Sequence, residues 1–247
     1  MRRNPPERKA RKRWASLCMN LLKTIKAIFD RPSQPTTYYD ADAYIAKHMA
    51  EINVKAESFM KKYGTDFFNF FYRPNLDLLI RKEVLPFKNP DSKHNDFLDN
   101  AHWLNKHPFN FPGPFYTGES DTCGTGDSEA PNNVMYDSHT CEYIFRQPQT
   151  FAEFLCVIDA ANVEVFNSYS CDGNNHWTYQ ICKDWWSDKE QLLKELQKPE
   201  LRNANGDRVQ LYIDYLNGEA EVDLKRYCYF LENGVYPTND TVKLPTL

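Results

Sequence analysis

An abrupt change of pattern near residue 109 limits the folds open to this chain. Before that point apolar residues recur at helical spacing, and residues 40–63 form a stretch of this kind that ends at Gly64, a residue type that commonly terminates helices. Between residues 109 and 186, Pro, Gly, Asp and Asn interrupt short apolar stretches, which is typical of loops and short strands. A helical N-terminal third followed by a mixed region predicts an α+β fold.

The mixed region predicts a small, mostly antiparallel sheet with flanking helices and long loops. Residues 133–137 and 142–146 have the composition of two strands joined by a short turn. Thr150 followed by Glu153 forms a capping box, which predicts a helix through residue 162. Three further elements are predicted: a capped helix that begins with Ser187 and Glu190 and stops near Pro199, a strand over residues 209–215, and a last helix over residues 222–231.

Charge is distributed unevenly along the chain. Residues 1–31 carry a net charge of +8, whereas the remaining residues carry −12. We therefore predict a basic leader with an amphipathic helix and a linker over residues 1–35, followed by a single α+β domain over 36–247, helical in 36–108 and mixed in 109–247. The acidic body disfavours nucleic-acid binding because phosphates repel it. Contact of residues 8–29 with a membrane surface or a partner stays open.

The seven cysteines indicate reduced thiols. They are scattered, odd in number and contain no CxxC pair, a pattern that favours a cytoplasmic protein. Asn20, Lys23 and Lys26 interrupt any apolar core of a secretory signal, and no apolar run reaches the length of a membrane span. We expect a bacterial cytoplasmic protein.

The candidates for catalysis or metal binding lie in the middle loops. Cys171 and His176 share one loop, and Cys123 lies in a Gly-flanked loop, so a thiol with an imidazole base is one hypothesis. Cys123, Cys141, Cys171 and His176 are also zinc-type ligands, but they lack the close pairs of structural zinc sites. Separate buried thiols and a tight glycine loop are the alternative, and we predict no metal and no cofactor.

Acidic residues suggest a surface for a basic protein partner. Glu119, Asp121, Asp127 and Glu129 crowd one loop without the pattern of a calcium-binding loop. A solvated acidic loop is the simplest interpretation. The functional interpretation is an acidic epitope, in which Asp172 adds charge and Trp177 provides an aromatic anchor.

Several segments of the middle region carry a resemblance. These are FPGPF (111–115), DTCGTG (121–126), EAPNNV (129–134), FRQP (145–148) and CDGNNHWT (171–178). With them the chain resembles a group of uncharacterised bacterial proteins, which implies no fold or activity. In a generic way it is also similar to immunity proteins of polymorphic toxins, which are acidic, cytosolic and without catalytic motifs.

Two functions follow as expectations. The first is a bacterial cytosolic interaction module, an immunity protein that binds and occludes a basic toxin or effector through its acidic surface. The alternative is a thiol- or zinc-dependent hydrolase that uses Cys123, Cys171 and His176. The absence of a recognisable catalytic constellation in the sequence favours the first.

Overall fold

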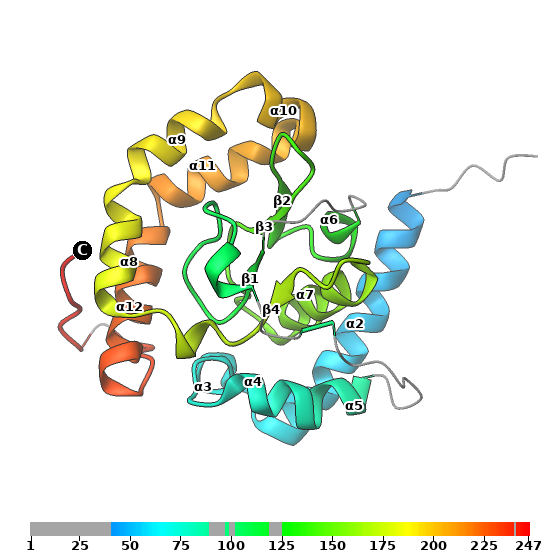
Figure 1. The fold of residues 1–247 in the computed structure, drawn as a ribbon. Coiled ribbons are helices and arrows are strands. Elements are labelled where there is room, and N and C mark those ends of the chain that lie inside the picture. Colours follow the sequence, from blue (N-terminus) through cyan, green and yellow to red (C-terminus); the bar gives the residue numbers. More distant parts are fainter. Residues whose placement is uncertain (1–40, 89–96, 99–101, 119–124, 240) are drawn as a thin grey trace, which may run out of the picture. The chain divides into compact units, whose positions relative to one another are not determined.

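The structure is a computed structural model that describes residues 41–88, 97–98, 102–118, 125–239 and 241–247. Contacts divide the chain into two units, Met1–Tyr44 and Ile45–Leu247. The predicted basic leader, residues 1–35, lies outside the described residues. The second unit has an α+β fold, as predicted, with helices and two small antiparallel sheets (Figure 1).

The N-terminal part of the described chain is helical, as the spacing of its apolar residues predicts. It comprises α2 (Ala41–Tyr63), α3 (Phe67–Phe71), α4 (Leu76–Leu79), a π-helical turn (Ile80–Val84) and α5 (Leu85–Lys88). After α2, Gly64 has a φ of +89°, a left-handed conformation that glycine adopts without steric cost. Asp66 then caps α3, because its carboxylate accepts a hydrogen bond from the Asn69 N–H at 3.1 Å.

The sheets are two separate strand pairs among the described residues, rather than the one small sheet that the sequence predicts. β2 (Val134–Tyr136) and β3 (Glu142–Ile144) form the predicted hairpin, with Val134 opposite Ile144. β1 (Tyr116–Thr117) pairs with β4 (Tyr169–Ser170), which lies far away in the sequence. A side chain links the pairs, because the Thr117 hydroxyl donates to the Glu142 carbonyl at 2.6 Å.

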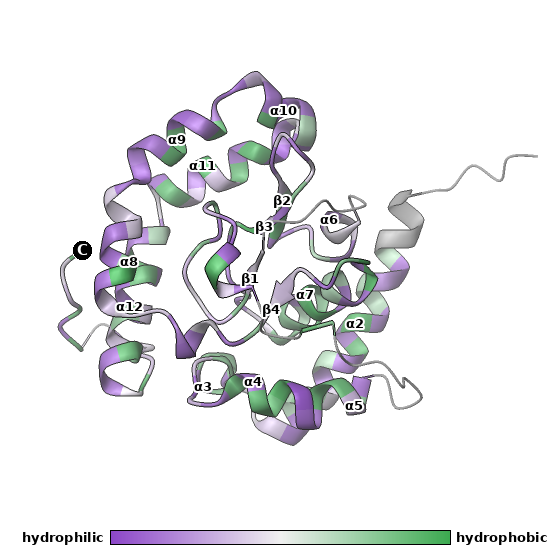
Figure 2. Ribbon diagram, in the orientation of Figure 1, coloured by the Kyte–Doolittle hydropathy of each residue, from purple (hydrophilic) through white to green (hydrophobic). Residues whose placement is uncertain are grey.

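Helix α7 (Phe151–Val163) begins where the capping box predicts. The Thr150 hydroxyl accepts from the Glu153 N–H at 3.1 Å, and the Glu153 carboxylate accepts from the Gln149 N–H at 2.8 Å. Figure 2 shows hydrophobic residues along most of this helix, and most of its side chains are buried. It therefore forms the centre of the core. The Phe154 ring meets that of Phe70 edge-on, with the centroids 5.2 Å apart. Phe67, Phe70 and Phe71 of the N-terminal third are buried in this core.

The C-terminal part is helical and corrects two predictions. It comprises α8 (Tyr179–Ser187), α9 (Lys189–Leu196), α10 (Pro199–Asn205), α11 (Val209–Asn217) and α12 (Ala220–Asn233). The predicted strand over 209–215 is helix α11, whose buried residues Val209, Tyr212, Ile213 and Leu216 follow helical spacing. Ser187 ends α8 instead of capping a new helix, and its hydroxyl donates to the Asp184 carbonyl at 2.7 Å.

Buried polar side chains hold the long middle loops, where regular backbone pairing is sparse. The Gln147 amide donates to the Phe111 and Phe115 carbonyls at 2.9 and 2.8 Å. Asn110 similarly binds the backbone of Thr117 and Ile144. Such bonds satisfy backbone groups that would otherwise be buried without partners. They explain how irregular loops become part of the core.

Glu142 is a further buried polar side chain that holds these loops, and its titration should make the stability depend on pH. Its carboxylate accepts from the Gly126 N–H at 2.8 Å and from the Tyr169 hydroxyl at 2.5 Å. Burial nevertheless raises the pKa of Glu142 above its ordinary value. Glu142 therefore binds a proton more tightly in the folded state than in the unfolded state. Its contribution to stability is complete below the unfolded pKa of about 4.3 and is lost as the pH rises through the folded pKa.

The variant Glu142→Gln mimics the protonated side chain and removes this titration. We expect the free energy of unfolding of the wild type, relative to Glu142→Gln, to fall as the pH rises from about 4 to 7. Urea unfolding of both proteins across this range measures the difference. A constant difference, or one that grows with pH, would contradict the assignment.

Candidate functional site

The loop that carries Cys171 and His176 is built around Asp172. The Tyr116 hydroxyl donates to one carboxylate oxygen of Asp172 at 2.8 Å, and Nε2 of His176 lies 2.9 Å from the other. The His176 ring also stacks on Trp103, with the centroids 4.9 Å apart. Asp172 therefore anchors the loop from inside, where it is buried.

Cys171 lacks the environment of an activated nucleophile. Its side chain is 1% exposed, and burial raises the pKa of its thiol well above the ordinary value. A reactive cysteine needs the opposite, a partly exposed thiol whose pKa is lowered by positive charge. Its proposed companion Cys123 lies outside the described residues.

The rate of thiol alkylation tests whether Cys171 is a buried, unreactive thiol or an activated nucleophile. In the native protein we expect iodoacetamide to modify Cys171 at least about 100-fold more slowly than free cysteine, because only the exposed thiolate reacts. Cys141, which is partly exposed, should react before it. Peptide mapping of the modified sites over time measures both rates. Alkylation of Cys171 faster than free cysteine at neutral pH would favour the hydrolase instead.

The acidic residues named as a partner surface are largely engaged within the protein. Asp127 forms an ion pair with Arg208 at 2.7 Å and accepts from the Tyr136 hydroxyl at 2.6 Å. Glu129 is buried and faces His48. Asp172 is occupied as described above, and Glu119 and Asp121 lie outside the described residues. The described members of this set thus do not form one exposed acidic face.

A groove of about 510 Å³ lies between the loop of residues 106–110 and helices α8 and α9. We call it the α8–α9 groove. Its apolar wall includes Phe109, Trp177, Ile181, Trp185 and Leu192. Of the predicted partner surface, as far as the structure describes it, Trp177 lines this groove. The volume falls within the range of ligand sites, about 300–1,000 Å³.

Helix packing fixes the shape of this groove. α8 packs against α12, and α9 packs against α11 (Figure 1). The Trp185 indole N–H donates to the Pro108 carbonyl at 3.2 Å, which ties α8 to the 106–110 loop. Trp185 also meets Phe111 edge-on, with a centroid distance of 5.4 Å. The aromatic wall is thus part of the core on one side and open on the other.

Negative charge lines the same groove. Asp184, Asp188 and Glu195 contribute carboxylates, and Asp184 and Asp188 are exposed. Glu195 already binds the Lys198 ammonium at 2.5 Å. Lys106, also in the lining, has its ammonium 4.6 Å from the centroid of the Trp103 ring and 5.6 Å from that of Trp177. The groove therefore combines exposed carboxylates with an aromatic wall that already holds a cation of its own chain.

Trp177 adds an unused donor to this wall. It is 3% exposed, and its indole N–H has no hydrogen-bond partner among the described residues. A buried donor without an acceptor costs about 1–3 kcal/mol.

The described metal-ligand candidates of the sequence, Cys141, Cys171 and His176, do not gather at one point, and Cys123 lies outside the described residues. Cys171 is buried beside the Asp172 loop, Cys141 lies at the turn of the β2–β3 hairpin, and His176 is paired with Asp172. Among the described residues, the group with ligand atoms close together is a different one, His48, Glu129 and Asp159. Of these, only Glu129 is a candidate from the sequence, as part of the acidic loop, because the three residues are distant in the chain.

The sequence also missed the two exposed carboxylates of the groove. Asp184 and Asp188 lie four positions apart around the end of α8, beside the Trp185–Trp186 pair. The signal for them is Thr178, which caps α8 because its hydroxyl accepts from the Ile181 N–H at 3.2 Å. A helix that begins there places residues four positions apart, such as Asp184 and Asp188, on the same side.

No protein-family model, curated protein or solved structure matches this chain. Among the described helices, none has both the length and the apolar character that a membrane crossing requires.

Proposed function

We propose that this protein is an interaction module that binds a basic protein in the α8–α9 groove. The observation that carries the proposal is the presence of exposed carboxylates, Asp184 and Asp188, at the edge of an aromatic wall. Aromatic anchors supply most of the binding energy in many protein interfaces, whereas charges at the rim steer the partner and select it. The net charge of −12 over residues 32–247 supports a basic partner.

The mode of action that fits such a module is occlusion. A partner side chain with an apolar stem and a cationic head, such as lysine or arginine, fits an aromatic wall bordered by carboxylates. The protein would then act in the bacterial cytoplasm as an immunity protein, covering the active surface of a basic toxin or effector. The free thiols of Cys156, Cys182 and Cys228 are consistent with a reducing compartment.

The test has two stages. First, the tagged protein is purified from its bacterial host at low salt, and mass spectrometry identifies a stoichiometric basic protein. Second, the toxic or enzymatic activity of that purified protein is titrated with the module. We expect inhibition to be complete near one equivalent and the affinity to fall with salt, because electrostatic steering is screened. A stable complex in which the partner keeps full activity would refute occlusion.

A further inference from the structure

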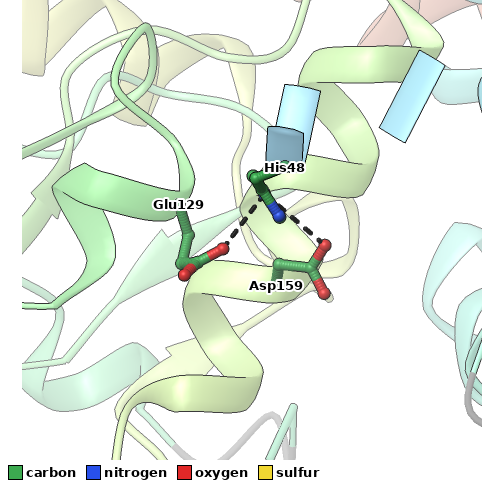
Figure 3. A group of neighbouring side chains, drawn as sticks. All are labelled: His48, Glu129 and Asp159. Carbon is green, nitrogen blue, oxygen red and sulfur yellow. Dashed lines mark ion pairs between the residues drawn. The ribbon is translucent and has the colours of Figure 1, made fainter. Parts of the chain in front are cut away.

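A second polar site lies apart from the α8–α9 groove, where three helices meet. It consists of His48 from α2, Glu129 from α6 (Gly126–Glu129) and Asp159 from α7. Figure 3 shows the three side chains pointing toward one another. Their exposed side-chain fractions are only 14%, 10% and 18%. The three groups are therefore held together inside the second unit rather than gathered on an open surface.

The distances match those between ligands of one small metal ion. His48 Nε2 lies 3.0 Å from Glu129 Oε2 and 4.0 Å from Asp159 Oδ2, and all three ligand atoms lie within 4.8 Å of one another. Zinc bonds to nitrogen and oxygen are about 2.0–2.2 Å long, so tetrahedral ligands stand roughly 3.4 Å apart. Small side-chain adjustments would bring the three atoms to that spacing.

Lys88 orients one of these ligands. Its ammonium, with a side chain only 1% exposed, donates to Asp159 Oδ1. The second carboxylate oxygen, Oδ2, is the one that faces His48. In many protein metal sites, a hydrogen bond to one oxygen of a carboxylate fixes the orientation of its other oxygen, which binds the metal. Lys88 thus holds Asp159 in position without occupying the oxygen that would bind a cation.

The ligand types select the class of metal. One imidazole nitrogen with two carboxylate oxygens suits zinc and related transition metals, whereas magnesium and calcium prefer oxygen ligands alone. We infer that His48, Glu129 and Asp159 form a binding site for one divalent transition-metal ion, with Zn²⁺ as the best match. Such a site would tie α2 to α6 and α7. It is independent of the proposed partner groove.

Zinc binding to the full chain tests the inference. The protein is treated with EDTA and dialysed, and zinc is then titrated by calorimetry and counted after gel filtration. We expect one equivalent bound with a dissociation constant of about 1 μM or tighter, and a zinc-dependent rise in the melting temperature. Magnesium at the same concentration should give neither effect. Less than one tenth of an equivalent of zinc would overturn the inference and leave an ion-pair network only.

Matched variants locate the bound ion. His48→Ala should weaken zinc binding by about 100-fold, whereas His139→Ala, the same change at a histidine whose side chain is 81% exposed, should leave it unchanged. Glu129→Gln keeps the side-chain volume and should weaken binding by about tenfold, so it serves if His48→Ala does not fold. Cys171→Ser should have no effect. Equal binding by His48→Ala and His139→Ala, or loss of binding in Cys171→Ser, would place the zinc elsewhere.

Discussion

Gly173→Ala is expected to lower the free energy of unfolding by about 3 kcal/mol, the largest single-residue effect we predict on stability. A methyl group at this position would lie 2.1 Å from the Gly113 carbonyl oxygen and 2.9 Å from that of Pro114. Both are backbone atoms, so no rotation of a side chain can relieve the overlap.

The surroundings of Gly173 also resist a shift of the backbone. Its N–H donates to the Pro114 carbonyl at 3.0 Å, which joins the 111–115 loop to the 171–178 loop. Gln147 holds the 111–115 loop from the other side through the Phe111 and Phe115 carbonyls. Separating the loops would break these bonds and disturb the Asp172 anchor next to Gly173.

Chemical denaturation of the variant measures the loss, and Gly64→Ala provides the matched control. Gly64 has a positive φ of +89°, but among the described residues, its two chain neighbours aside, none comes within 4 Å of the added methyl group. We expect this control to cost about 1 kcal/mol, from backbone strain alone. If Gly173→Ala costs no more than Gly64→Ala, the two loops do not pack as the structure describes.

The second large effect concerns the α8–α9 groove. The double variant Asp184→Lys/Asp188→Asn should raise the dissociation constant for the basic partner by about 100-fold, equivalent to about 2.7 kcal/mol. It reverses one exposed charge and removes the other while leaving the aromatic wall intact. Asn at position 188 also remains a favourable residue at the start of α9.

A control with the same change in net charge isolates the groove. Asp214 on α11 and Glu232 on α12 are exposed and lie outside the groove lining. Asp214→Lys/Glu232→Gln should therefore change the affinity by less than about threefold, through long-range charge alone. Surface plasmon resonance of both variants, with the partner immobilised, gives the rates. Equal losses in the two variants would show that only net charge matters.

Local signals in the sequence predicted local structure. The start of α7 follows from Thr150 and Glu153, because a capping contact joins residues three positions apart. The β2–β3 hairpin could be predicted in the same way, since its strands are neighbours in the sequence. The prediction of a strand over residues 209–215 was wrong. The alternation of Val209, Leu211 and Ile213 fits a strand, but these residues belong to helix α11. The burial of Tyr212 and the 48% exposure of Leu211 settle the choice.

The candidate sites depend on contacts between distant residues, which the sequence could not supply. An acidic residue such as Asp172 has the composition of a surface group, and only the approach of Tyr116 shows it to be an internal anchor. The same holds for Glu129, whose neighbour His48 lies on another helix. The strand pair β1–β4 is a third case, because two-residue strands carry too little pattern to predict their pairing.

Hydrogen exchange of the complex tests the central proposal most directly. The exchange of backbone amides is compared in the free protein and in the protein saturated with its basic partner. We predict slower exchange in residues 106–110 and in α8 and α9 on binding, because these segments form the groove. Protection confined to other segments, with the groove unchanged, would contradict the account.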